Sequence, residues 1–138
     1  MFLLDTNPCI VYLNGRSPAL RERVDSAGDD NIVVCSIVRA ELLFGAAKSR
    51  SPEKTSLAQE DFLGRFRSLP FDDVAARAYG PIRAELERSG ATIGAHDLLI
   101  ASIAIANNLI LVTHNTGEFG RIPGLVIQDW EIAATASR

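Results

Sequence analysis

Cysteine, histidine and tryptophan are scarce in this sequence: its 138 residues contain two cysteines, two histidines and one tryptophan. Cys9 and Cys35 do not form a C-x-x-C pair, and each lies in an apolar run. Cysteines in such surroundings behave as small hydrophobic side chains that are buried in the core. We therefore expect neither a disulfide nor a zinc site at these two positions.

Long hydrophobic runs are also missing. The longest, residues 98–106, contains Ser102 and is too short to span a bilayer. The first residues lack the positively charged start and the cleavage site of a signal peptide. No low-complexity tract and no block of like charge interrupts the chain, so disorder is not expected away from its ends. We expect a cytoplasmic protein that does not associate with membranes.

An excess of positive charge is absent as well, since the formal net charge is −3 and the pI is about 5.3. Proteins that bind nucleic acid usually carry a basic face. Any contact with nucleic acid must therefore be local. Twelve of the 14 basic residues are arginine; this excess suits bidentate phosphate binding, but a compositional bias would produce it equally well.

The apolar pattern predicts a single domain, residues 1–138, in which strands alternate with helices. Strands are expected at 2–4, 32–35, 109–113 and 125–127, with a very short edge strand at 69–71. Helices are expected at about 8–14, 18–27, 36–48, 52–66, 72–90 and 98–106, the fifth with a kink at Gly80-Pro81. Strands separated by helices pair in parallel, which predicts an α/β fold: a three-layer α/β/α sandwich with a short, mostly parallel sheet.

Three acidic residues stand in apolar surroundings, where a charged side chain is costly. Asp5 directly follows the first strand, Glu41 shares a helical face with apolar residues one turn away, and Asp97 opens the most apolar helix. The carboxyl ends of parallel strands form the edge at which α/β proteins bind ligands. Each acid also has a simpler interpretation, because either aspartate could cap a helix and Glu41 could extend to water.

Carboxylates gathered at one sheet edge would repel and raise one another's pKa unless a cation compensated them. Oxygen ligands without His or Cys spacing favour Mg²⁺ or Mn²⁺ over zinc. Glu118 is a further candidate ligand, or else a solvated loop residue. Several polar residues nearby could support the site, or could serve turns, caps and packing instead: Thr6, Asn7, His96, Thr113, His114 and Asn115.

Four segments together resemble the PIN-domain toxins called VapC: residues 2–7 (FLLDTN), 39–42 (RAEL), 97–101 (DLLIA) and 113–119 (THNTGEF). Their order and spacing agree with the family over nearly the whole chain. Residues 69–72 (LPFD), followed by 79–90 (YGPIRAELERSG), are similar to the subgroup described as initiator-tRNA-specific endonucleases.

The resemblance implies a PIN fold and the toxin component of a type II toxin–antitoxin system. Such a toxin would be an Mg²⁺- or Mn²⁺-dependent endoribonuclease that hydrolyses phosphodiester bonds in RNA, with tRNA as the expected substrate. It would form a homodimer and a hetero-oligomer with a VapB-type antitoxin. The resemblance places Asp5, Glu41 and Asp97 among the metal ligands and catalytic residues. Asn115 stands where many members carry a fourth acid; we expect it to act in catalysis by orienting a metal-bound water, and the presence of a second metal stays open.

Two other α/β classes that bind Mg²⁺ through carboxylates do not fit. A receiver-type signalling domain uses a lysine near the end of the chain, whereas Lys48 and Lys54 lie mid-chain. A haloacid-dehalogenase-like phosphatase needs an aspartate two residues after the first, where this chain has Asn7. A catalytically idle PIN-like module, which binds only nucleic acid or a partner, remains the alternative.

Contacts to RNA and to an antitoxin can also be anticipated. Basic residues after the first two strands could hold RNA, or could form a solvated helix face: Arg16, Arg21, Arg23, Lys48 and Arg50. An antitoxin peptide is expected on apolar surface near helices 18–27 and 36–48, because residues 42–44 are apolar in succession and cannot all face one core. A contact between two copies of the chain would explain an outward-facing apolar residue among 42–44 equally well.

Overall fold

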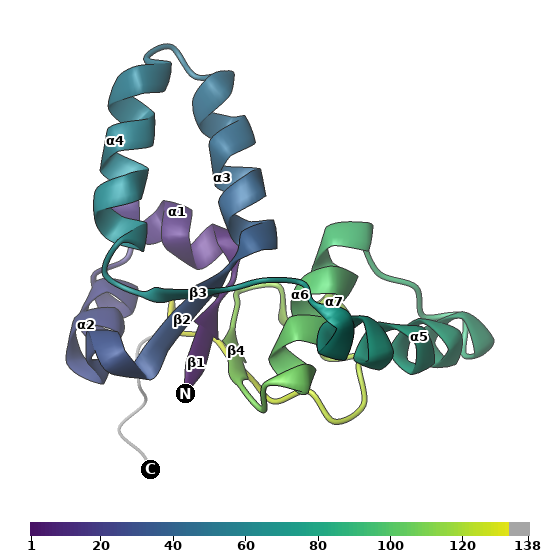
Figure 1. Ribbon diagram of the computed structural model, residues 1–138. Coiled ribbons are helices and arrows are strands. Elements are labelled where there is room, and N and C mark those ends of the chain that lie inside the picture. Colours follow the sequence, from purple (N-terminus) through teal and green to yellow (C-terminus); the bar gives the residue numbers. More distant parts are fainter. Residues whose placement is uncertain (133–138) are drawn as a thin grey trace.

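Residues 1–132 are described by the computed structural model, in which a parallel sheet is flanked by helices (Figure 1). The strands lie in the order β3-β2-β1-β4-β5, and each pairs in parallel with its neighbours. The strands are β1 Phe2–Leu4, β2 Ile32–Cys35, β3 Arg67–Leu69, β4 Ile110–Val112 and β5 Ile127–Gln128. The helices are α1 Thr6–Asn14, α2 Pro18–Ala27, the 3-10 helix η1 Asp29–Asn31, α3 Ser36–Ala47, α4 Pro52–Leu63, α5 Asp73–Arg88, α6 Ala95–Ala106 and α7 Thr116–Phe119. The predicted α/β sandwich with a parallel sheet is confirmed.

The central strand β1 sets the position of the candidate site. Leu3 is paired with Val33 of β2 on one side and with Leu111 of β4 on the other. The β1–β4 pairing continues for one more residue, because Asp5 N–H donates to the Val112 carbonyl at 3.0 Å. The chain therefore leaves β1, β2 and β4 at the same edge of the sheet, where α1, α3 and the segment before α7 begin.

The core consists of the strands and the helices that cover them. All four residues of β2 are buried, as expected for a strand between two helical layers. Helix α6 is almost entirely apolar, and its one hydroxyl, Ser102, donates to the Leu98 carbonyl at 2.7 Å. Cys9 and Cys35 are both buried, which confirms that they pack as small hydrophobic side chains. Within residues 1–132 no helix has the length and apolar character needed to cross a bilayer.

Two helical pairs extend from the sheet in different directions (Figure 1). Helices α3 and α4 pack against each other and project together beyond the carboxyl edge of the sheet. Helix α5 packs along α6 on the other side of that edge. The carboxyl edge of the sheet, which carries Asp5, therefore lies at the base of the α3–α4 pair.

Several predicted boundaries differ from the structure. The edge strand is Arg67–Leu69 rather than 69–71, because Pro70 has no N–H to donate to a neighbouring strand. Helix α5 continues through Pro81, as predicted, but it begins at Asp73 and ends at Arg88, inside the predicted limits of 72 and 90. Helix α4 ends at Leu63, before the predicted end at 66, and β5 is shifted towards the C-terminus.

The end of α7 offers a test of local packing, since this short helix carries Glu118. A Cβ at Gly120 would lie 2.6 Å from the Thr116 carbonyl oxygen, whereas a Cβ at Gly117 would have no atom within 4 Å. We predict that Gly120→Ala lowers the free energy of unfolding by about 1–3 kcal/mol, the usual cost of overpacking. The matched control Gly117→Ala should not destabilise. Urea unfolding measures both variants, and equal stabilities would contradict the packing of α7.

Candidate metal centre and active site

Four acidic side chains meet at the carboxyl edge of the sheet. Asp5 follows β1, Glu41 lies on α3, Asp97 lies in the first turn of α6 and Glu118 lies on α7. The charges of the other three carboxylates all raise the pKa of Asp97, so the four lie within short electrostatic range. We call these residues the carboxylate cluster. The structure thus brings together the three acids that the sequence singled out, and adds Glu118.

Asp5 is the most buried member of the cluster, with 6% of its surface exposed. Burial raises the pKa of its carboxyl above the usual value, hydrogen bonds from Thr6 N–H and the Thr113 hydroxyl lower it, and the charge of Glu41 raises it again. The Thr113 hydroxyl donates to Asp5 Oδ2 at 2.9 Å and is itself fully buried. One carboxylate oxygen is thereby oriented by a rigid donor at the end of β4.

Asp97 carries the clearest sign of charge crowding. Burial raises its pKa to about 6, and the charges of Asp5, Glu118 and Glu41 contribute in that order. The side-chain amide of Asn115 donates to Asp97 Oδ2 at 3.3 Å and opposes the shift. Asn115 therefore stands beside the cluster as a hydrogen-bond donor.

The two glutamates are held by donors from neighbouring elements. The Thr6 hydroxyl donates to Glu41 Oε1 in a short hydrogen bond, and His96 Nδ1 lies 3.3 Å from Glu41 Oε2. Glu118 Oε1 accepts from the backbone N–H of Gly94 at 2.9 Å. Each glutamate thus keeps a fixed direction at the rim of the cluster.

No lysine or arginine compensates this negative charge in the part of the chain that the structure describes. The ion pairs there include only one member of the cluster, Glu41, with the exposed His96 as its partner. The nearby thiols are unsuitable as ligands, because burial raises the pKa of Cys35 to about 11 and that of Cys9 further still. An uncompensated set of oxygen donors fits a hard divalent cation such as Mg²⁺ or Mn²⁺.

The sequence matches the PIN domain family over residues 2–125. It is 41% identical to the tRNA(fMet)-specific endonuclease VapC of Salmonella typhimurium, covering 94% of this chain and 97% of the relative. It is 39% identical to ribonuclease VapC2 of Rickettsia felis, covering 95% of this chain and 98% of the relative. The chain belongs to the VapC ribonucleases of the PIN-domain family. The predictions of family and of ribonuclease function are thereby confirmed.

Solved structures of VapC proteins have the same fold. The DNA-bound VapBC structure from Salmonella typhimurium contains a chain with a TM-score of 0.89 and 41% identity, covering 94% of this chain and 97% of that one. The Rickettsia felis VapBC2 structure, bound to a promoter DNA fragment, gives a TM-score of 0.88 and 38% identity, covering 94% and 98%. These similarities support the predicted PIN fold.

Arg21, Arg23 and His114 make contacts outside the carboxylate cluster in this VapC-type chain. Arg21 donates to the Tyr12 carbonyl at 2.7 Å, and Arg23 lies over the Trp130 ring at 5.1 Å from its centroid. Both guanidinium groups are engaged within the fold by residues outside the carboxylate cluster. His114 also contacts residues other than the cluster, since its Nδ1 lies 2.8 Å from Asp129 Oδ2.

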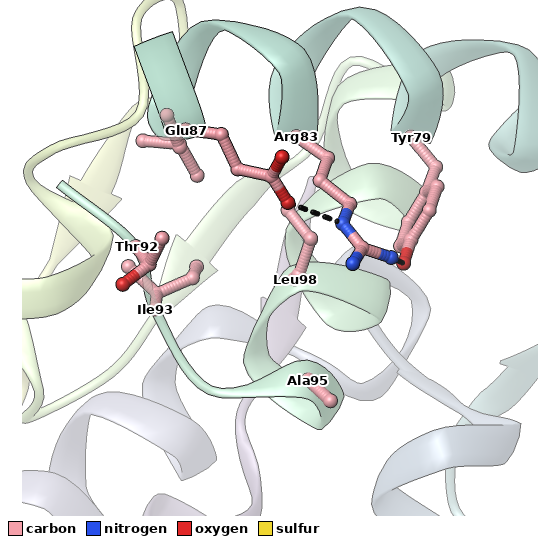
Figure 2. A pocket seen from close by; sticks show the side chains of 8 residues that line it. Tyr79, Arg83, Glu87, Thr92, Ile93, Ala95 and Leu98 are labelled. Atoms are coloured by element: carbon pink, nitrogen blue, oxygen red, sulfur yellow. Dashed lines mark hydrogen bonds and ion pairs between the residues drawn. The ribbon is translucent and has the colours of Figure 1, made fainter. Parts of the chain in front are cut away.

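A pocket of about 230 Å³ lies between α5 and the first turn of α6 (Figure 2). On one side of it Arg83 donates to Glu87 Oε2 at 2.9 Å and to the Tyr79 hydroxyl at 2.9 Å. Glu87 balances the charge of Arg83, so the pocket has no strong electrostatic preference. None of the four acids lines this pocket, and α6 connects it to the carboxylate cluster.

The raised pKa of Asp97 predicts how stability depends on pH. In the unfolded chain an aspartate titrates near its ordinary value, whereas folded Asp97 has a pKa of about 6, so its ionised form destabilises the fold above that pH. Without divalent cation, Asp97→Asn should exceed the parent in stability at about pH 7.5 by roughly 1 kcal/mol after solvent screening. The difference should vanish towards about pH 4, below which the folded and unfolded carboxyls are both protonated.

Urea unfolding in the presence of a chelator, repeated across this pH range, measures the difference. The control is Asp30→Asn, an exposed acid of η1 that precedes β2 and so lies at the opposite edge of the sheet. A parent that is more stable than Asp97→Asn at neutral pH would show that the cluster is not under electrostatic strain.

Proposed function

We propose that this chain is the toxin of a VapBC-type pair and hydrolyses phosphodiester bonds in initiator tRNA, with Mg²⁺ or Mn²⁺ held by Asp5, Glu41 and Asp97. The main support is the meeting of four carboxylates at one site, without a compensating lysine or arginine in the described residues; the raised pKa of Asp97 is its consequence. Such a site is unfavourable on its own and becomes favourable when a cation binds.

The bound cation supplies Lewis acidity towards the phosphodiester and a lowered pKa for the attacking water. The residues of the chain position the ligands for this chemistry. Thr113 and Thr6 donate to Asp5 and Glu41, which fixes the direction of each carboxylate. Asn115 donates to Asp97 at 3.3 Å, and this contact supports the proposal that it orients a water at the same site. Glu118 adds a further negative charge at the rim, where the structure holds it against Gly94.

The choice of RNA rests on the relatives. The Salmonella typhimurium protein, at 41% identity over 94% of this chain, is named a tRNA(fMet)-specific endonuclease. The overall charge of −3 gives no general attraction to RNA, so the tRNA must be held by local contacts around the site. Specificity therefore depends on the residues that surround the carboxylate cluster rather than on a broad basic face.

The proposed partner is a VapB-type antitoxin, as in the VapBC structures that resemble this chain, together with a second copy of the toxin. Leu43 and Phe44 of α3 are 49% and 64% exposed, whereas Leu42 is buried. Leu43 lines an apolar groove between α3 and α4 with Leu57, which is 69% exposed. Helix α2 buries its large apolar side chains, so the proposed antitoxin surface moves from α2 and α3 to α3 and α4.

The catalytic assignment predicts that Asp5→Asn and Asp97→Asn each lower cleavage of initiator tRNA at least about 100-fold, because each loses a charge that holds the cation. The fold should be retained, since both changes remove repulsion. Purified protein with Mn²⁺ and the tRNA transcript gives the rate, and Asp30→Asn serves as the matched control. Full activity in either variant would refute the assignment. A wild-type protein that binds Mn²⁺ but cleaves no RNA would support the catalytically idle alternative.

The partner assignment predicts that Phe44→Ser weakens binding of the antitoxin encoded beside this gene at least about tenfold, since exposed aromatic residues often dominate interfaces. Val74→Ser, which removes a 48% exposed apolar side chain on α5, is the control. The double variant Asp5→Asn/Asp97→Asn should also bind less tightly, because a basic antitoxin residue would lose its acidic partners. Affinity that is unchanged in the double variant would show that inhibition does not involve the carboxylate cluster.

A further inference from the structure

A second group of ligand atoms lies beyond the ends of β4 and β5. His114 follows β4 by two residues, and Asp129 and Glu131 follow β5. His114 Nδ1 lies 2.8 Å from Asp129 Oδ2 and 3.8 Å from Glu131 Oε2, and the group offers three ligand atoms that all lie within 4.8 Å of one another. We call these three residues the histidine cluster.

The histidine cluster makes no direct contact with the carboxylate cluster. Among the described residues, no hydrogen bond or ion pair joins His114, Asp129 or Glu131 to Asp5, Glu41, Asp97 or Glu118. Residues of the carboxylate cluster likewise have no part in raising the pKa of His114, which responds to its hydrogen bond with Asp129 and to the charges of Asp129 and Glu131. Two independent groups of donors therefore occupy the same edge of the sheet.

A buried oxygen of Glu131 has no hydrogen-bond donor among the described residues. Glu131 Oε2 is inaccessible to solvent, and it accepts no hydrogen bond from any residue in the described range 1–132. Its distance of 3.8 Å from His114 Nδ1 is too long for a hydrogen bond. A buried charged acceptor without a hydrogen-bond donor is destabilising, so such an atom calls for a ligand.

The turn that carries the two acids is rigidly held. Trp130, between them, is buried, contacts the Phe2 ring edge-on at 4.9 Å between centroids, and donates to Gln128 Oε1 at 2.8 Å. Asp129 Oδ1 accepts from the backbone N–H of Glu131 at 3.0 Å, which leaves Oδ2 directed towards His114. The ligand atoms are thus largely in place before any cation arrives.

We propose that His114, Asp129 and Glu131 form a second cation site that takes Zn²⁺ or a similar borderline divalent metal. An imidazole with two carboxylates is a donor set that zinc accepts in proteins, unlike the all-oxygen carboxylate cluster. Bonds of 2.0–2.2 Å in a tetrahedral arrangement put ligand atoms about 3.4 Å apart. The distances from His114 Nδ1 to Asp129 Oδ2, 2.8 Å, and to Glu131 Oε2, 3.8 Å, lie on either side of that value. The cation would satisfy Glu131 and tie the turn after β5 to the end of β4.

The test is calorimetric titration of ZnCl₂ into the variant Asp5→Asn/Asp97→Asn, which removes competing binding at the carboxylate cluster. One Zn²⁺ per chain should bind, and more tightly than Mg²⁺ or Mn²⁺ binds to the same variant. Adding His114→Ala should weaken Zn²⁺ binding at least about tenfold. Substitutions of residues that only support a metal ligand already cause a loss of about that size, and His114 is a proposed ligand itself. Adding His96→Ala instead, which removes the other exposed histidine, should leave the affinity unchanged.

Folding and binding are separated by a second measurement. The thermal midpoint of the alanine variant is first measured without metal, because the loss of His114 takes a hydrogen-bond partner from the largely buried Asp129 and lowers stability by itself. Zn²⁺ should raise the midpoint of the parent and not that of the variant. Glu131→Gln should likewise weaken Zn²⁺ binding. Absence of Zn²⁺ binding, equal affinity after His114→Ala, or a loss caused by His96→Ala instead would each overturn the proposal.

Discussion

Mutual repulsion among carboxylates at one edge of the sheet is the constraint on which the rest of the site depends. Asp5, Glu41, Asp97 and Glu118 come from four different elements, and the parallel strand order forces those elements to meet. Burial then prevents water from screening the charges, as the raised pKa values of Asp5 and Asp97 indicate. The same repulsion lowers the stability of the metal-free fold and favours the binding of a hard divalent cation.

Uncharged hydrogen-bond donors orient the carboxylates of the cluster, so they do not neutralise its negative charge. The hydroxyls of Thr6 and Thr113, the amide of Asn115 and the backbone N–H of Gly94 each direct one carboxylate. An arginine in any of these places would satisfy the same oxygen but would also compete with the cation. The donor pattern therefore explains how the acids can be well oriented and still remain available to a metal.

Much of this could be predicted from the sequence. Strands such as Ile32–Cys35 are unbroken apolar runs, which is enough to predict them. Asp5 and Asp97 stand at the ends of such runs, so the local pattern also identifies them as candidate site residues. Glu118 could be named only as a candidate, because it lies on a four-residue helix without apolar periodicity and reaches the site through a hydrogen bond to distant Gly94. Chain order alone suggests that Arg21 and Arg23 lie near the site. In the folded chain their guanidinium groups instead stack over the rings of Tyr12 and Trp130. The partnership of His114 with Asp129 and Glu131 depends on the pairing of β4 with β5, which no local pattern reveals.

We propose that the carboxylate cluster holds a hard divalent cation. Anomalous diffraction from crystals of the protein grown with Mn²⁺ tests this most directly, because it locates the metal without reference to activity. We expect a strong anomalous peak coordinated by oxygens of Asp5 and Asp97, with Glu41 as the further protein ligand, and no such peak in the Asp5→Asn/Asp97→Asn variant. Saturating Mn²⁺ that leaves no peak among these carboxylates in the wild-type protein would contradict it.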